Sequence, residues 1–224
     1  MIGRVAYAYL KWKQGRRSEP SPLLSGIGLL YKRLRSASQL FVSVEHYGAK
    51  VKIPGEVLSI SLATLIRRGA TPPWKGRLLY EIVRARVPQR ILELGTHLGF
   101  GTMYLAAAAP QAEIVTIEAS PTLAERARLH FKLLGLKPKI QVGLFEAVIP
   151  TLAGEWDVIY IDGDHRGSAL HEYVGKLYPQ LSPAGLIICD DIFWSWDMWR
   201  GWKSLSQAYP VKRYILGPFG ILVR

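Results

Sequence analysis

The chain has 224 residues, 49% of them hydrophobic, which suffices for one α/β domain with a sizeable core and argues against a second full domain. The longest apolar runs, such as 159–161 and 186–189, are far shorter than the roughly 20 residues that cross a bilayer, so we expect no membrane-spanning helix. Cys189 is the only cysteine, which excludes an internal disulfide and predicts a small core residue rather than a redox centre.

The net charge of +12 is concentrated in the first part of the chain. Residues 1–90 carry 17 Lys and Arg against 4 Asp and Glu, a net charge of +13, whereas residues 91–224 carry 12 against 13, a net charge of −1. A basic segment on a neutral body favours an anionic partner, namely lipid headgroups, nucleic acid or an anionic substrate. A solvated basic face is the alternative interpretation.

The first residues have the pattern of a basic amphipathic helix, because apolar side chains recur at helical spacing between residues 2 and 12 beside Arg4, Lys11 and Lys13. We predict that residues 1–17 contact an anionic membrane surface rather than nucleic acid, and a homodimer is a second partner that we consider. No small-residue cleavage site of a signal peptide follows. We therefore expect a cytoplasmic protein, at most peripheral to the inner membrane face.

The rest of the N-terminal segment gives weaker signals. Gly, Ser and Pro predict a loop over 14–22, and alternation around Gly48 predicts a hairpin within 41–53. The sequence "TPPW" at 71–74 ends a helix predicted over 57–69 and precedes a second one over 75–86. We predict that residues 1–74 form an N-terminal extension and residues 75–224 the main domain.

From Arg90 onward, short apolar strands alternate with segments of helical length. The predicted strands are 90–95, 113–118, 139–142, 156–162, 185–190, 211–216 and 219–223. The predicted helices between the first five strands are 99–109, 121–135, 145–153 and 167–180. This alternation predicts a doubly wound, Rossmann-like α/β fold with a seven-stranded, mostly parallel sheet. Only Gly217 and Pro218 join the last two strands, so the final strand must be antiparallel to its neighbour.

Ligands of such folds bind at the carboxyl ends of the strands, where this chain has acids and glycines. Gly95 and Gly99 allow close backbone approach after the first strand. Glu118 ends the second strand, where an acid can accept the hydroxyls of a ribose. These features indicate an adenosine-containing cofactor. A dinucleotide fits poorly, because His97 stands where its G-x-G-x-x-G motif needs the middle glycine.

The sequence resembles the class I S-adenosylmethionine-dependent methyltransferases, through "ELGTHLGFGT", "VTIEAS", "VIYIDGDH" and "GLIICDDIFWS" over about residues 75–224. The resemblance implies that Glu93 and Gly95 flank the amino-acid end of S-adenosylmethionine and that Glu118 holds its ribose. Leu144 replaces the usual acid after the third strand, so Phe145 is the candidate for stacking on adenine. The cofactor-binding residues that we predict are Glu93, Gly95, Thr96, Gly99, Glu118, Ala119, Phe145 and Asp162.

Three carboxylates end the fourth and fifth strands: Asp162, Asp190 and Asp191. Convergent carboxylates repel one another and need a cation or raised pKa values, and hard oxygen ligands suit Mg²⁺, which would hold an acceptor hydroxyl and lower its pKa. The same pattern is similar to that of the metal-dependent O-methyltransferases of the catechol and macrocin types. Asp164 or His165 would then take the proton of the acceptor, although either could instead cap the next helix.

The segment "FWSWDMWRGW" at 193–202 follows these acids and permits two interpretations. It forms either a helix packed in the core, or an acceptor pocket lined by Trp196, Trp199 and Lys203. We predict methyl transfer from S-adenosylmethionine to a hydroxyl of a small molecule, with Mg²⁺ assistance. The alternatives are an NAD-dependent oxidoreductase, disfavoured by the glycine spacing, and a non-catalytic membrane-binding or nucleic-acid-binding module with a vestigial cofactor fold.

Overall fold

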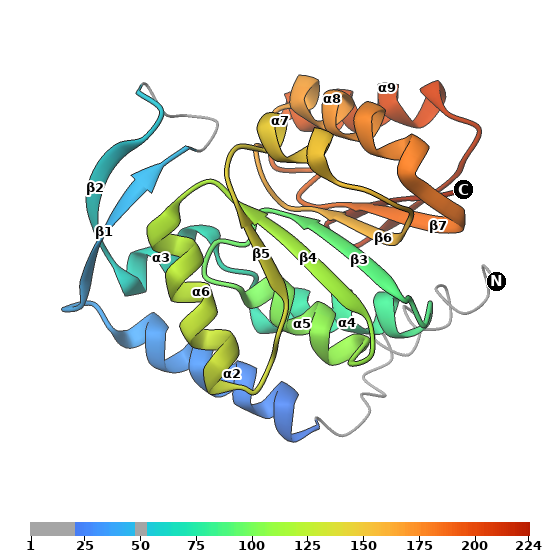
Figure 1. The fold of residues 1–224 in the computed structure, drawn as a ribbon. Coiled ribbons are helices and arrows are strands. Elements are labelled where there is room, and N and C mark those ends of the chain that lie inside the picture. Colours follow the sequence, from blue (N-terminus) through green and yellow to red (C-terminus); the bar gives the residue numbers. More distant parts are fainter. Residues whose placement is uncertain (1–20, 48–52) are drawn as a thin grey trace.

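The computed structural model describes residues 21–47 and 53–224. At its centre lies a seven-stranded sheet in the order β5-β4-β3-β6-β7-β9-β8 (Figure 1). Its strands are β3 (Arg90–Leu94), β4 (Glu113–Glu118), β5 (Lys139–Val142), β6 (Trp156–Ile161), β7 (Leu181–Cys189), β8 (Lys212–Leu216) and β9 (Phe219–Val223). Strands β3 to β7 are parallel, whereas β9 is antiparallel to both β7 and β8. The predicted fold class is confirmed.

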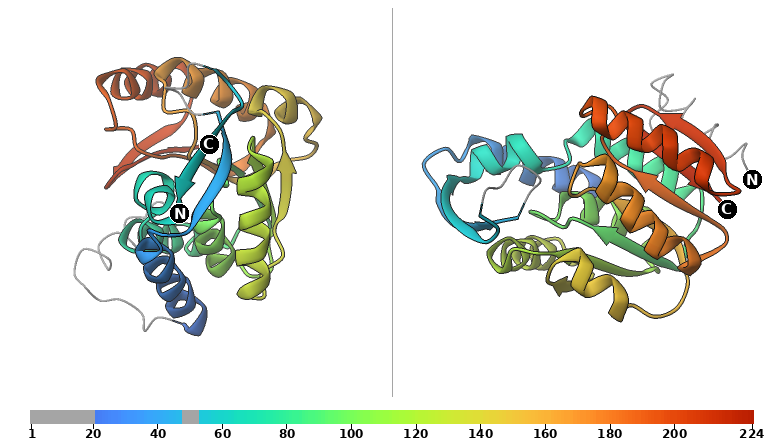
Figure 2. Two further views of the ribbon diagram at one scale, coloured as in Figure 1. Left: turned by 90° about the vertical axis from the view of Figure 1, so that its left-hand side faces the viewer. Right: turned by 90° about the horizontal axis from the view of Figure 1, so that it is seen from above.

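Helices cover both faces of the sheet (Figure 2). Helices α4 (Pro73–Arg84) and α5 (Phe100–Ala108) lie on one face, and α7 (Phe145–Val148), α8 (Gly167–Leu177) and α9 (Trp196–Ala208) lie on the other. Successive strand residues point to opposite faces, so Ile91 packs with α4 and α5 while Leu92 packs in the cluster that contains α8 and α9. Short 3-10 turns, η1 (Ile149–Thr151) and η2 (Tyr178–Gln180), extend α7 and α8. The helical segment predicted over 167–180 has these bounds, whereas the one predicted over 145–153 ends at Thr151.

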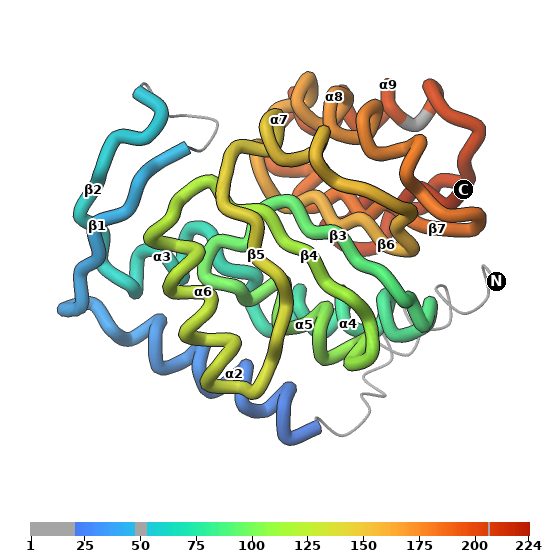
Figure 3. Tube along the Cα trace, in the orientation of Figure 1, coloured from blue at the N-terminus to red at the C-terminus, as the bar shows by residue number. Residues whose placement is uncertain are grey.

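The N-terminal segment packs on the edge of this sandwich. It contains α2 (Pro22–Ser36), the antiparallel pair β1 (Phe41–His46) and β2 (Glu56–Ser61), and α3 (Leu62–Gly69). Helix α2 packs on α3 and α5 (Figure 3), and α6 (Pro121–Leu133) follows β4. Ile27 and Ile66 are buried in one cluster with Phe100 and Phe131, so the segment shares its core with the main domain. The division at residue 74 stays a prediction.

The predictions for this segment need three corrections. Residues 57–61 are not helical but belong to β2, because they pair with β1 in a register that places Phe41 opposite Ser61. The predicted hairpin therefore extends beyond residue 53 to β2. Helix α2 was not predicted, although Ser21 caps it and Pro22 stands at its first position.

Other predictions cannot be compared with the structure. The basic helix over 2–12, the membrane contact of 1–17 and the turn at 48–52 lie outside the described residues. Among the helices that are described, none has both the length and the apolar character that crossing a bilayer requires.

Candidate active site

Glu93, on β3, is fully buried. Its Oε2 accepts hydrogen bonds from the hydroxyls of Thr102 on α5 and Thr116 on β4, the latter at 2.6 Å. Its Oε1 has no hydrogen-bond partner among the described residues. Burial raises the pKa of Glu93 to about 8, although the two hydroxyls lower it. A buried acceptor without a partner is costly, so Glu93 is suited to receive a donor, and a cation would offset its burial best.

The turn after β3 brings backbone close to backbone. Gly95 has a φ of +102°, and a Cβ at this position would lie 2.2 Å from the carbonyl oxygen of Asp162. Gly99, with a φ of +82°, is the N-cap of α5. The hydroxyls of Thr96 and Thr116 are 2.6 Å apart. Only glycine fits at Gly95, because any side chain would separate the ends of β3 and β6.

Glu118 ends β4 and holds the neighbouring turns in place. Its Oε2 accepts the backbone N–H of His97 at 2.6 Å, and its Oε1 accepts that of Ser120 at 2.9 Å. Burial raises the pKa of Glu118, while these backbone hydrogen bonds lower it. Ala119 is the next residue along the chain after Glu118. Each carboxylate oxygen has two lone pairs, so Glu118 can still accept hydroxyl groups of a ligand.

The β1–β2 hairpin reaches the same strand end through Glu45. Its carboxylate accepts hydrogen bonds from the Ser120 hydroxyl at 2.5 Å and from the Thr122 hydroxyl at 3.0 Å. Both residues lie at the N-terminus of α6, where the helix dipole favours a negative charge. The hydrogen bonds of Glu45 therefore hold the hairpin in place beside Glu118.

Phe145, the first residue of α7, lies between the ends of β5 and β6. A Cβ on Gly163 would lie 2.8 Å from its ring, and the ring meets Tyr173 edge to face with centroids 5.3 Å apart. The ring is thus held next to the loop that follows Asp162.

The three predicted acids do converge, but they differ in their surroundings. Asp190 is fully buried, and its carboxylate accepts hydrogen bonds from the Tyr160 hydroxyl at 2.5 Å and from the Asp191 N–H at 2.6 Å. Lys75 Nζ lies 2.8 Å from Asp190 Oδ2 and 2.9 Å from Asp191 Oδ1. Burial and the other carboxylates raise the pKa of Asp190, whereas Lys75 lowers it.

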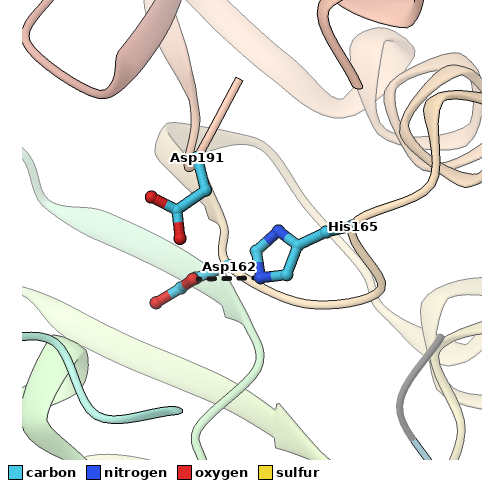
Figure 4. Close-up of side chains that lie close together, drawn as sticks. All are labelled: Asp162, His165 and Asp191. Carbon is cyan, nitrogen blue, oxygen red and sulfur yellow. Dashed lines mark ion pairs between the residues drawn. The ribbon is translucent and has the colours of Figure 1, made fainter. Parts of the chain in front are cut away.

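Asp162, His165 and Asp191 form the accessible part of this cluster (Figure 4). One ligand atom from each lies within 4.8 Å of the others, and His165 Nε2 is 3.9 Å from Asp162 Oδ1. Burial raises the pKa of Asp162 to about 6, although Lys75 lowers it. Two carboxylate oxygens and an imidazole at this spacing fit a divalent cation.

Asp164 is occupied by other partners. Its carboxylate accepts hydrogen bonds from the Arg166 guanidinium, at 2.6 Å from Nε, and from the Tyr173 hydroxyl at 3.0 Å. Its pKa is lowered by these bonds in spite of partial burial. The two residues that we predicted for proton transfer therefore lie in different environments, since His165 faces the acids and Asp164 faces Arg166.

Comparison with known proteins agrees with this geometry. A family model described as a methyltransferase domain matches residues 92–192. A methyltransferase of Podospora anserina, solved in its SAH-bound form, superimposes with a TM-score of 0.69 at 22% identity, covering 98% of this chain and 93% of that one. The predicted resemblance to the class I methyltransferases is confirmed.

Curated relatives carry names of the same kind. The chain is 35% identical over 118 residues to a catechol O-methyltransferase of Mycobacterium tuberculosis, covering 51% of this chain and 54% of the relative. It is 31% identical over 158 residues to an O-methyltransferase of Aspergillus hancockii, covering 67% and 63%. The chain thus matches less than two thirds of the length of these two relatives.

The tryptophan-rich segment is divided between the core and the surface, and the predicted acceptor pocket stays a prediction. Trp202 is buried against Gly220, whose Cβ, if present, would lie 2.6 Å from the indole. In contrast, Phe193, Trp194 and Trp196 are 57%, 58% and 71% exposed. The Trp194 ring lies 6.0 Å from the His165 ring between centroids. An exposed aromatic rim therefore borders the accessible acids.

Several residues that organise the candidate site could not be recognised from the sequence. Lys75 and Tyr160 bind the acids directly, and Glu45 reaches the end of β4 from the hairpin. Lys75 is one of many basic residues before position 91, and Tyr160 is one of several aromatic residues in apolar strands. Only the three-dimensional arrangement separates them from the others.

Proposed function

We propose that the protein is an S-adenosylmethionine-dependent methyltransferase that acts on a hydroxyl of a small molecule. The observation that carries this proposal is the buried, unpartnered Oε1 of Glu93 beside the Gly95 turn, with Glu118 at the next strand end. The amino group of the cofactor is a cation that would supply the missing donor. The names of the relatives, catechol O-methyltransferase and O-methyltransferase, support oxygen as the acceptor atom.

In this proposal, different strand ends bind different parts of the cofactor. Glu93, Gly95, Thr96 and Gly99 receive its amino-acid end, while Glu118 and Ala119 face the ribose. The Phe145 ring, held by Gly163 and Tyr173, offers a flat surface for adenine. Asp162 lies between this cofactor site and the acidic cluster, since its carbonyl oxygen approaches Gly95 and its carboxylate approaches His165.

The acidic cluster supports a magnesium ion as the second cofactor. Asp162 and Asp191 would hold the ion, with His165 within reach, and a bound ion would lower the pKa of an acceptor hydroxyl. Asp190, the third ligand in our prediction, already accepts bonds from Lys75, Tyr160 and the Asp191 N–H. We therefore propose Asp162 and Asp191 as the principal carboxylate ligands.

His165 is the candidate for accepting the proton of the acceptor. Its Nε2 faces Asp162, whose negative charge would favour the protonated imidazole that results. Asp164 is the weaker candidate, because Arg166 and Tyr173 already bind its carboxylate. Methyl transfer itself depends mainly on holding the acceptor oxygen in line with the donor, which is a matter of positioning.

The aromatic rim of Phe193, Trp194 and Trp196 favours an aromatic or otherwise apolar acceptor. Such exposed rings offer contact area at low entropic cost to a flat molecule whose hydroxyl points to Asp162 and His165. Catechol is a suitable first probe, because it has this shape and appears in the name of a relative.

The decisive experiment is a calorimetric titration with S-adenosylhomocysteine. It is followed by an assay of methyl transfer to a panel of aromatic hydroxyl acceptors, of which catechol is the first. We expect the wild-type protein to bind, Glu118→Ala to lose affinity, and the control Glu125→Gln, on the exposed surface of α6, to behave as wild type. Binding of S-adenosylhomocysteine to neither the wild type nor the control would refute the proposal.

A further inference from the structure

Lys75 occupies an unusual position for a cation. It stands in the first turn of α4, where the helix dipole disfavours positive charge, and its side chain is 8% exposed. Burial alone would lower the pKa of Lys75, but Asp162, Asp190 and Asp191 together raise it, so the side chain remains an ammonium. Among the described residues, these carboxylates offset the cost of placing a charge there.

Asp190 is correspondingly turned toward the interior. Its Oδ2 receives both Lys75 at 2.8 Å and the Tyr160 hydroxyl at 2.5 Å, and its Oδ1 receives the Asp191 N–H at 2.6 Å. Neither oxygen belongs to the group formed by Asp162, His165 and Asp191. The cluster thus has an inner half, Lys75 with Asp190, and an outer half.

The charges match this division. With all three acids ionised and His165 neutral, the three carboxylates and one ammonium have a net charge of −2, which one divalent cation would neutralise. Lys75 touches both halves, since its Nζ is also 2.9 Å from Asp191 Oδ1. Its positive charge therefore opposes a cation bound at the outer half.

We propose that Lys75 determines where the cation binds: it neutralises Asp190 and restricts the cation to the outer half of the cluster, with Asp162 and Asp191 as its carboxylate ligands. This inference rests on the proposed function, because it concerns the cation of the same site. Lys75 itself touches no reacting atom in this account and acts through Asp190 and Asp191.

The test is a titration of the protein with Mn²⁺, in the absence of cofactor and acceptor. Binding is measured by electron paramagnetic resonance and by calorimetry. Lys75→Met removes the inner cation, Lys75→Arg retains it, and Lys75→Met with Asp190→Asn removes both members of the inner pair. Lys176→Met is the matched control, because Lys176 forms an exposed pair with Glu172 away from the cluster. Circular dichroism verifies that each variant is folded.

We expect Lys75→Met to bind Mn²⁺ at least about tenfold more tightly than the wild type, since a like charge close to the ion is gone. Lys75→Arg, the control and the double variant should stay within about threefold of the wild type. If Lys75→Met does not fold, the double variant decides alone, with retained Mn²⁺ affinity as the supporting result.

Two results would overturn the inference. Unchanged or weaker Mn²⁺ binding by folded Lys75→Met would show that the ammonium does not oppose the cation. Loss of Mn²⁺ binding in the folded double variant would show that Asp190 is itself a required ligand. Titration of the same samples with S-adenosylhomocysteine tests the proposed function separately, and its failure leaves the comparison of Mn²⁺ affinities unchanged.

Discussion

Binding of S-adenosylhomocysteine should release a proton from Glu93. The pKa of this buried carboxyl group is raised to about 8, so at pH 7 about 0.9 of the molecules without ligand hold a proton there. A ligand ammonium at the unpartnered Oε1 stabilises the charged form and lowers the pKa toward its ordinary value of 4.5. Close to one proton should therefore leave on binding, and the affinity should rise about tenfold from pH 6 to pH 7.

Calorimetry in buffers of different ionisation enthalpy measures this proton release directly. Glu93→Gln retains the shape of the side chain but cannot release a proton, so its binding should be weaker and independent of pH over this range. Glu125→Gln, on an exposed part of α6, should show the wild-type release. Binding without proton release at pH 7, or with an affinity that is the same at pH 6 and pH 7, would refute the pairing of Glu93 with a cation.

Four further outcomes are expected. Without ligand, the folded-state pKa of Glu93 lies above its ordinary value of 4.5, so stability is lost as the pH rises from about 4.5 through 8, and Glu93→Gln should exceed the wild type in Tm increasingly over that range. Gly95→Ala should lower the free energy of unfolding by about 2 kcal/mol or more in urea titrations and abolish S-adenosylhomocysteine binding, because its φ is +102°. Glu45→Gln should cost about 1 kcal/mol of unfolding free energy through its weaker bond from Ser120, and should weaken cofactor binding in the same calorimetric assay. His165→Gln should reduce kcat about 100-fold in an assay of methyl transfer to an accepted hydroxyl, with an unchanged Kd for S-adenosylhomocysteine.

The sheet could be predicted well because its strands are marked by local signals. Strands β4, β5 and β9 have the bounds that the sequence predicted. Most strands are short apolar runs between turn residues, which is typical of parallel strands buried on both faces. In contrast, β2 could not be recognised, because its state depends on pairing with β1 across an intervening loop rather than on its own residues.

The candidate site could be predicted only as a set of strand ends. The sequence placed Asp190 and Asp191 together, and the convergence with Asp162 is observed. However, successive side chains at a strand end point in different directions, so one acid of the pair faces the interior and the other the accessible edge. The partners of the inner acid come from α4 and β6, and no spacing along the chain indicates them.

Part of the candidate site lies outside the segment that matches the family model. The segment that matches the family model, residues 92–192, contains the cofactor turn and the acids but neither Lys75 nor Glu45. Lys75 reaches the acids from α4, and Glu45 reaches the β4 end from the hairpin. Residues before the matched segment therefore supply a positive charge to the acidic cluster and a negative charge at the end of β4. A fragment that begins near residue 90 would retain the recognisable motifs, but it would lose α4, which packs on the sheet through Leu78, Leu79 and Ile82, and with it the counter-ion of Asp190.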